Sequence, residues 1–221
     1  MTDRVDAVVF DVLETLLDLD PLAERLEAVG QPGSVLGPFF MRFQRDAMAL
    51  TLAGDVADFT ATARQALRTE TKQAMTDAEI DHVLEGFATV PAFLDAVPAL
   101  RRLSDAGVRV GCLTVGDPDQ TRSFLEGAGL DQYVDEVVTC DTVGVWKPAP
   151  EVYRHAADAL DCPLERMALV AVHAWDCHGA TKAGALAGWC SRLEGEPGEV
   201  FLPADVRGGD LVEVVDGLLA L

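Results

Sequence analysis

Four short segments of the chain carry the side chains that covalent hydrolysis requires: FDVLETL, LTVGD, WKP and HAWD, in that order. A carboxylate nucleophile needs a cation to orient it, a hydroxyl donor beside it, and water to cleave the ester that it forms. Asp11 is the candidate nucleophile, Lys147 the cation, and Thr15 and Thr114 the hydroxyl donors. Taken singly, an Asp after a strand favours a turn or N-cap, and Lys-Pro favours a loop. Their joint occurrence indicates catalysis.

Short runs rich in β-branched residues alternate with helical patterns, which is typical of a parallel sheet flanked by helices. Each of the four segments lies near the end of an expected strand. In a doubly wound fold, the carboxyl ends of the strands form one crevice, so the segments should converge there. The expected strands are 5–10, 108–113, 134–139, 167–172 and 186–191.

The stretch between the first two strands has no convincing strand pattern. It holds helical runs at 21–29, 38–52, 56–67 and 77–87, separated by turn-forming residues. We therefore expect an α/β protein with a doubly wound (Rossmann-like) parallel sheet core and an inserted all-helical cap domain. The expected division is a core of 1–16 and 90–221 and a cap of 17–89.

Composition narrows the classes of partner. The formal charge is −20, which argues against nucleic acid and anionic membranes. No apolar run has the length of a membrane span, and the N-terminus lacks a signal-peptide pattern, so a cytoplasmic protein is expected. The five cysteines form no CxxC pair and are expected to be buried, reduced thiols.

In these four segments and in the helical insertion, the chain resembles the haloacid dehalogenase superfamily, and within it the L-2-haloacid dehalogenase branch. The resemblance covers nearly the whole chain and implies a small 2-haloacid substrate, a homodimer, and a pairing of Lys147 with Asp176. In VWKPAPEVY, Tyr153 follows Lys147 at the family's spacing. HAWDCHGA resembles the fourth motif of the dehalogenase branch, with Trp175 and Asp176 in register.

Two positions separate this chain from the magnesium-dependent phosphatases of the superfamily. The resemblance places Leu13 where those enzymes carry an acid that protonates the leaving alkoxide, and Val172 where they carry an Asp that binds magnesium. An apolar side chain offers no oxygen ligand to a hard cation. We therefore expect no metal and no cofactor, and a halide leaving group that needs no proton.

The resemblance also implies substrate-binding residues in the cap. Arg42 and Arg45 lie three apart, hence on one helical face, and either is a candidate to bind the substrate or halide. The alternative for each arginine is a solvated surface charge. Further candidate substrate or halide contacts, several of them an apolar wall around the halogen, are Val12, Leu13, Phe59, Val115, Tyr153 and Trp175.

Two departures from the family pattern suggest a dyad. The first motif usually has Gly where this chain has Glu14, and the fourth motif has His173 in place of an Asn that is associated with positioning water. If the two side chains meet, Glu14 orients His173 as a general base for the hydrolysis step. The alternative is a strand-end histidine satisfied by local hydrogen bonds.

Two other functions stay open for the whole chain. It could be a phosphatase, or a catalytically silent protein of the same fold.

Overall fold

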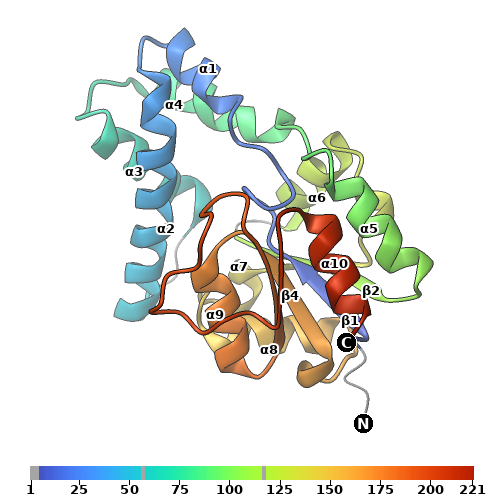
Figure 1. Cartoon of the computed structure of the whole chain (residues 1–221). Coiled ribbons are helices and arrows are strands. Elements are labelled where there is room, and N and C mark those ends of the chain that lie inside the picture. The colour runs from blue at the N-terminus through green and yellow to red at the C-terminus, as the bar shows by residue number, and fades with distance from the viewer. Residues whose placement is uncertain (1–4, 56–57, 116–117) are drawn as a thin grey trace.

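Six parallel strands form one sheet in the order β3-β2-β1-β4-β5-β6 (Figure 1). The computed structural model describes residues 5–55, 58–115 and 118–221. β1 lies at the centre, and its Phe10 pairs with Cys112 of β2 and Val170 of β4. The expected fold class is confirmed. The strands are β1 Ala7–Phe10, β2 Arg109–Thr114, β3 Glu136–Thr139, β4 Met167–Ala171, β5 Leu186–Cys190 and β6 Val206–Gly208.

Helices cover both faces of the sheet. On one face α5 packs against α10, and on the other α8 packs against α9 (Figure 1). α6 and α7 follow β2 and β3 and contact β3. The inner strands are buried on both faces, which explains their continuous apolar runs. These helices are α5 Ala96–Asp105, α6 Pro118–Gly127, α7 Cys140–Val143, α8 Pro150–Ala159, α9 Ala174–Ala183 and α10 Leu211–Leu219.

Between β1 and α5, each regular element in residues 22–55 and 58–89 is helical. The expected run 56–67 corresponds to α3, which begins at Phe59, while residues 56 and 57 lie outside the described part of the chain. The exact domain boundaries at 16/17 and 89/90 stay a prediction. The elements are α1 Leu22–Ala28, η1 Gly33–Val35, α2 Leu36–Ala53, α3 Phe59–Glu70, α4 Asp77–Leu84 and η2 Glu85–Thr89.

Aromatic packing joins the cap helices to the sheet domain. The ring of Phe43 on α2 lies 5.2 Å from that of Trp146, edge to face, and 5.0 Å from that of Phe59. The Trp146 backbone N–H also donates to Thr51 Oγ1 of α2 at 3.0 Å. α2 is thereby held over the loop that carries the next residue, Lys147.

The thiols of the structure meet a further expectation. All five cysteines are buried and free, and burial raises the pKa of Cys112 and of Cys140 to about 12. Within residues 5–55, 58–115 and 118–221, no helix is long and apolar enough to span a bilayer.

Gly179 sets how closely α9 approaches the segment around Lys147. A Cβ at this position would lie 2.6 Å from Pro148 Cβ and 2.6 Å from Tyr153 Oη. We predict that Gly179→Ala lowers the free energy of unfolding by about 1–3 kcal/mol, because a well-packed site must shift to admit the methyl group. Urea unfolding measures the change. Gly37→Ala on α2, where nothing lies within 4 Å, serves as the control and should raise stability by up to about 1 kcal/mol. Equal effects of the two substitutions would contradict the packing argument.

Candidate active site

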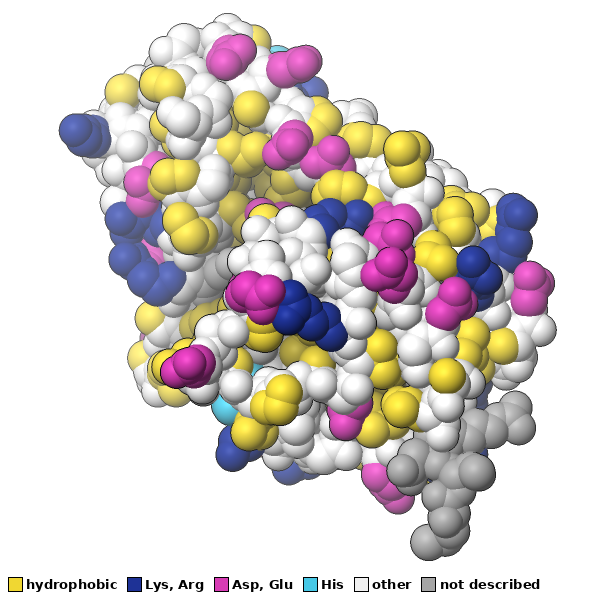
Figure 2. Space-filling model, in the orientation of Figure 1, with side chains coloured by type: hydrophobic (Ala, Val, Ile, Leu, Met, Phe, Trp, Pro, Cys, Tyr) yellow, Lys and Arg dark blue, Asp and Glu magenta, His cyan; other side chains and the backbone are white. Residues whose placement is uncertain are grey.

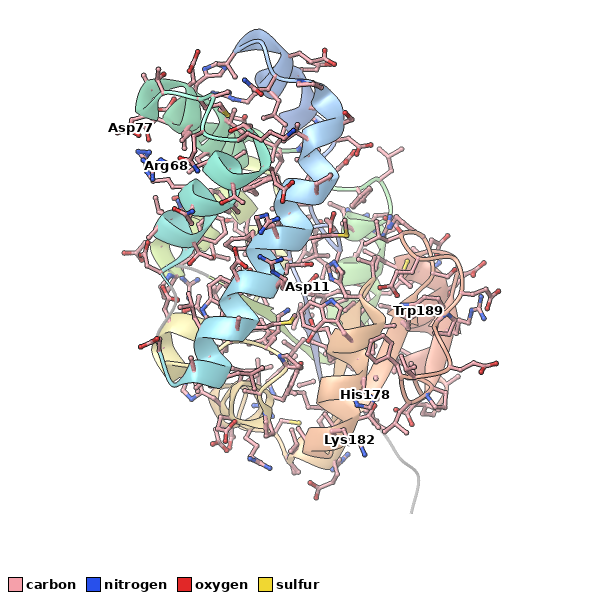
Figure 3. All side chains as sticks on the ribbon, turned by 90° about the vertical axis from the view of Figure 1, so that its left-hand side faces the viewer. Asp11, Arg68, Asp77, His178, Lys182 and Trp189 are labelled. Atoms are coloured by element: carbon pink, nitrogen blue, oxygen red, sulfur yellow. The ribbon has the colours of Figure 1, made fainter. Side chains whose placement is uncertain are left out.

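Asp11 stands directly beyond β1, at the carboxyl edge of the sheet. Its backbone N–H still donates to Val170 O of β4 at 3.0 Å, so the strand pairing fixes its position. Only 7% of the residue is exposed. Figure 3 shows Asp11 beneath α2, between the cap helices and the sheet domain. The carboxylate therefore lies at the junction of the two parts of the chain.

Lys147 links the carboxylates of Asp11 and Asp176. Its Nζ lies 2.7 Å from Asp11 Oδ1 and 2.6 Å from Asp176 Oδ2, and it donates to Leu113 O at 3.1 Å. Tyr153 donates its hydroxyl to Asp176 Oδ1 at 2.6 Å. Lys147 and Asp176 are almost fully buried, so their charges are held in place by each other and by these hydrogen bonds.

Thr15 holds the other oxygen of the nucleophile. Its hydroxyl donates to Asp11 Oδ2 at 2.6 Å and accepts from the Val172 backbone N–H at 3.2 Å. Thr15 is fully buried. A single hydroxyl thus joins the turn after β1 to the end of β4, and the carboxylate cannot rotate without breaking that link.

His173 lies between two carboxylates. Its Nε2 is 2.8 Å from Glu14 Oε2, and its Nδ1 is 3.3 Å from Asp11 Oδ2. The side chains of Glu14 and His173 therefore meet, as the dyad hypothesis requires. Nδ1 is buried and has no hydrogen-bond partner among the described residues. The amide Nε2 of Gln44 lies 3.4 Å from His173 Nε2.

Glu14 occupies a backbone conformation that favours glycine. Its φ is +68°, and a left-handed conformation of this kind costs about 1–2 kcal/mol for a residue with a Cβ. Glu14 lies inside a tight turn that is closed by hydrogen bonds from the Leu16 and Leu17 N–H groups to Val12 O. This turn imposes the left-handed conformation. The turn aims the Glu14 side chain at His173 at the expense of backbone strain.

The two cations keep the nucleophile ionised. Burial alone would raise the pKa of Asp11, but Lys147 and His173 lower it well below its usual value. Burial alone would lower the pKa of Lys147, and the carboxylates of Asp11 and Asp176 raise it above its usual value. Burial raises the pKa of Asp176, so Asp11 is the more acidic of the two carboxyls that share Lys147.

His173 is a cation at neutral pH in the resting protein. Burial alone would lower the pKa of His173, but the carboxylates of Asp11 and Glu14 outweigh it and raise the pKa to about 10. An imidazolium donates protons and cannot accept one, so His173 is not a base while Asp11 carries its charge. Any basic role depends on a change at Asp11.

A small, mostly apolar cavity opens onto the nucleophile. Leu13, Thr114, Val115 and Trp175 line it together with Asp11 and Lys147, as the sequence predicted for substrate contacts or catalysis. Residues 116 and 117 of the LTVGD segment lie outside the described residues. The remaining lining residues are Phe40, Phe43, Gln44, Met48 and Trp146.

The structure does not bring the predicted arginines to Asp11. Arg42 pairs with Glu70 of α3. Arg45 pairs with Asp46 at 2.6 Å and lines a neighbouring groove. The buried face of α2, with Phe40, Phe43 and Ala47, packs against the core, and both arginines lie off that face.

Three other predicted residues are close to the site without lining the cavity. Phe59 is buried behind Phe43 in the cap, with its ring 5.6 Å from that of Phe87. Val12 is buried in the turn after Asp11, and Tyr153 lies beneath Asp176. These residues support the wall of the cavity rather than forming its surface.

Helical spacing on α2 would have identified the residues that the sequence reasoning missed. Phe40, Gln44 and Met48 are spaced by four and share one helical face. Gln44 is the polar residue on that face. The spacing can be read from the sequence, but it points to the site only once α2 is known to lie over Asp11.

Other polar clusters lie away from Asp11. Arg68 and Asp77 pair at the outer side of the cap, and His178 and Lys182 lie on α9 at the opposite end of the molecule (Figure 3). His178 Nδ1 accepts from the Leu202 N–H at 3.0 Å. Across the described ranges, no group of three or more His, Cys, Asp and Glu side chains is arranged to hold a metal ion.

Comparison with known proteins establishes the family. A family model described as haloacid dehalogenase-like hydrolase matches residues 5–184. The chain belongs to the haloacid dehalogenase-like hydrolases, as the resemblance of its motifs predicted.

Individual relatives share nearly the full length. The chain is 28% identical to (S)-2-haloacid dehalogenase 4A of Burkholderia cepacia, over 97% of this chain and 95% of that protein. It is 28% identical to (S)-2-haloacid dehalogenase 1 of Pseudomonas sp. (strain CBS-3), over 99% of each. The crystal structure of the L-2-haloacid dehalogenase RSc1362 superimposes with a TM-score of 0.90 at 27% identity, over 99% of this chain and 100% of that one.

The charge on His173 predicts how stability depends on pH. The pKa of His173 rises from an ordinary 6.5 to about 10 in the folded protein. Its stabilising contribution is therefore complete below about pH 6.5 and is lost as pH rises through about 10. Between pH 7.0 and 8.5 the advantage of the wild type over His173→Gln should shrink by about 2 kcal/mol, at about 1.4 kcal/mol per pH unit. Urea unfolding of both proteins at both pH values measures it, and parallel pH profiles would contradict the assignment.

Proposed function

We propose that the protein is a hydrolase that releases halide from 2-haloalkanoic acids, of the (S)-2-haloacid dehalogenase type. The observation that carries the proposal is the buried Asp11 carboxylate, held by Lys147 and Thr15 beneath a cavity whose walls are mostly apolar. A carboxylate held in this way is poised to attack carbon. The relatives named above carry the same activity in their names.

In the first step a carboxylate oxygen of Asp11 attacks C2 of the substrate. A C–O bond forms, the carbon–halogen bond breaks, and the halide leaves with its electron pair while C2 is inverted. Halide departs without a proton. The reaction therefore does not need the acid that the phosphatases of the superfamily carry at the position of Leu13. The product of this step is a neutral aspartyl ester on Asp11.

We propose that neither step uses a divalent metal ion. Support comes from two residues: Lys147 Nζ occupies the space between the carboxylates of Asp11 and Asp176, and position 172 is a buried valine without a ligand atom. The ammonium group supplies the positive charge that orients the nucleophile. The same two features disfavour a magnesium-dependent phosphatase.

Formation of the ester changes the protonation of His173. The carboxylate charge of Asp11, 3.3 Å from Nδ1, disappears when the ester forms. With one of its two anionic neighbours neutralised, the pKa of His173 falls, and the imidazole can give up its proton. Glu14 still accepts from Nε2 and keeps the ring oriented. His173 thus becomes a base only after the nucleophile has been used.

In the second step water attacks the ester carbonyl of Asp11. His173 takes one proton from the water, and the bond between the carbonyl carbon and the ester oxygen breaks. The second proton of the water passes to the departing alkoxide, which leaves as the 2-hydroxyacid with an oxygen that came from Asp11. The water oxygen stays in the regenerated carboxylate. General-base assistance of this kind contributes roughly 10²- to 10⁴-fold. A homodimer stays a prediction that rests on the resemblance, and a cytoplasmic location stays a prediction that rests on the sequence patterns alone.

Halide release tests the proposed function. We predict bromide release from (S)-2-bromopropionate that EDTA does not change, and a loss of at least about 10³-fold in Asp11→Asn, because no other group can form the ester. In one turnover in H₂¹⁸O, mass spectrometry should find the label in the Asp11 peptide. Label confined to the product, abolition by EDTA, or phosphate release in place of halide release would refute the proposal.

Loss of His173 should separate the two steps. We predict that His173→Gln releases one equivalent of halide per site in a burst and then turns over about 10²- to 10⁴-fold more slowly. Trapped ester should appear as added mass on the peptide that contains Asp11. Steady-state turnover within about twofold of the wild type would remove His173 from the mechanism.

NMR tests whether the pKa of His173 depends on the charges of Asp11 and Glu14. NMR titration of the His173 ring should give a lower pKa in Asp11→Asn, whose amide resembles the ester in charge, than in the wild type. Glu14→Gln should lower that pKa as well, because it removes the second carboxylate. An unchanged pKa in Asp11→Asn would contradict the proposed coupling between the ester and the base.

A further inference from the structure

A wide groove adjoins the cavity above Asp11. It measures about 740 Å³ and runs between α2 and the loop that follows β5. In Figure 1 the long loop between β5 and β6 extends from the sheet domain on the side where α2 lies. The groove and the cavity share Gln44, Met48 and Trp175 as lining residues, so the two spaces adjoin along these three side chains.

The cavity above Asp11 is too small for a substrate. On the same measure it is about 30 Å³, which is room for roughly two water molecules. The groove lies within the range of about 300–1,000 Å³ that is typical of small-molecule sites. A molecule that puts its halogenated carbon against Asp11 must therefore extend past Gln44 and Trp175 into the groove.

The outer walls of the groove are apolar and exposed. Met41 and Leu52 of α2 are 65% and 90% exposed, and Leu193 on the facing loop is 49% exposed. Figure 2 shows hydrophobic side chains gathered in the hollow between the cap helices and the sheet domain. Several large apolar side chains facing one groove are typical of a surface that is covered by a ligand or partner.

Charges are arranged along the groove from its inner to its outer end. His173 lines the groove at the end nearest Asp11, whereas Lys147 lines only the adjoining cavity. Glu14 and Glu194 also line the groove, the latter accepting from the Ala174 N–H at 3.0 Å. Arg45 pairs with its neighbour Asp46. The apolar walls favour a hydrocarbon tail along the outer part of the groove.

We propose that this groove binds an extended apolar substituent on C2 of the substrate, so that the preferred substrates are medium-chain rather than two- or three-carbon 2-haloacids. The inference rests on the proposed function and adds the class of substrate to it. The groove shares three wall residues with the small cavity above Asp11, which favours an occupant that is part of the reacting molecule. Burial of each methylene group on the groove wall supplies the selectivity.

A chain-length series tests the groove. We expect kcat/KM for halide release to rise about two- to fourfold for each methylene added, hence at least about 30-fold from (S)-2-bromopropionate to (S)-2-bromooctanoate. The double variant Met41→Gln/Leu52→Gln should lower the ratio of the two kcat/KM values at least about fivefold. Leu94→Gln replaces a leucine that is 98% exposed outside the groove and should change neither value.

Calorimetric measurement of the binding of unreactive acids tests the groove independently of the proposed reaction. (S)-2-hydroxyoctanoate should bind at least about tenfold more tightly than lactate. If no haloacid is turned over but this preference holds, the proposed reaction fails and the groove stands. If haloacids are turned over with no dependence on chain length, the groove proposal is overturned.

Sedimentation tests the other occupant, a second copy of the chain. Dissociation of a dimer by Met41→Gln/Leu52→Gln, with an unchanged ratio of kcat/KM values, would make the groove an interface between copies. That result would also overturn the proposal. A lower ratio without a change in oligomeric state supports it.

Discussion

The ammonium group of Lys147, buried between the carboxylates of Asp11 and Asp176, is the interaction on which the site depends. Three charges taken out of water are tolerated only when each has a partner at short distance, and removal of one leaves an uncompensated buried charge. The sheet supplies the geometry, because β1 and β4 lie side by side and the lysine arrives from the loop beyond β3. The nucleophile is therefore oriented by the fold before any substrate binds.

His173 adds a second cation whose charge depends on the state of the nucleophile. Glu14 and Asp11 flank its ring, and the strained turn at Glu14 holds one of these carboxylates in place. A histidine flanked by two carboxylates is protonated, and a histidine flanked by one carboxylate and an ester is less so. In the mechanism proposed above, loss of the Asp11 charge on ester formation is therefore what allows His173 to act as a base.

α2 lines both the small cavity above Asp11 and the neighbouring groove. Phe43 packs on Trp146, beside Lys147, so the helix is fixed over the nucleophile. Its inward face closes the small cavity, whereas Met41 and Leu52 border the groove. The net charge of −20 does not set the field at the nucleophile, because the nearest charged groups there are Lys147 and His173.

Local patterns were sufficient to predict the parallel sheet, the helical insertion and the convergence of the four segments, because strand ends in a doubly wound fold meet at one edge. Residue types at the ends of expected strands also identified Asp11 and Lys147, and departures from the motifs of the resembling family identified the pair of Glu14 and His173. The pattern did not reveal β6, which is three residues long. The resemblance also suggested Arg42 and Arg45, but their helical spacing says only which side chains share a face, not which face meets the core. That depends on packing against distant residues, as does the pKa of His173.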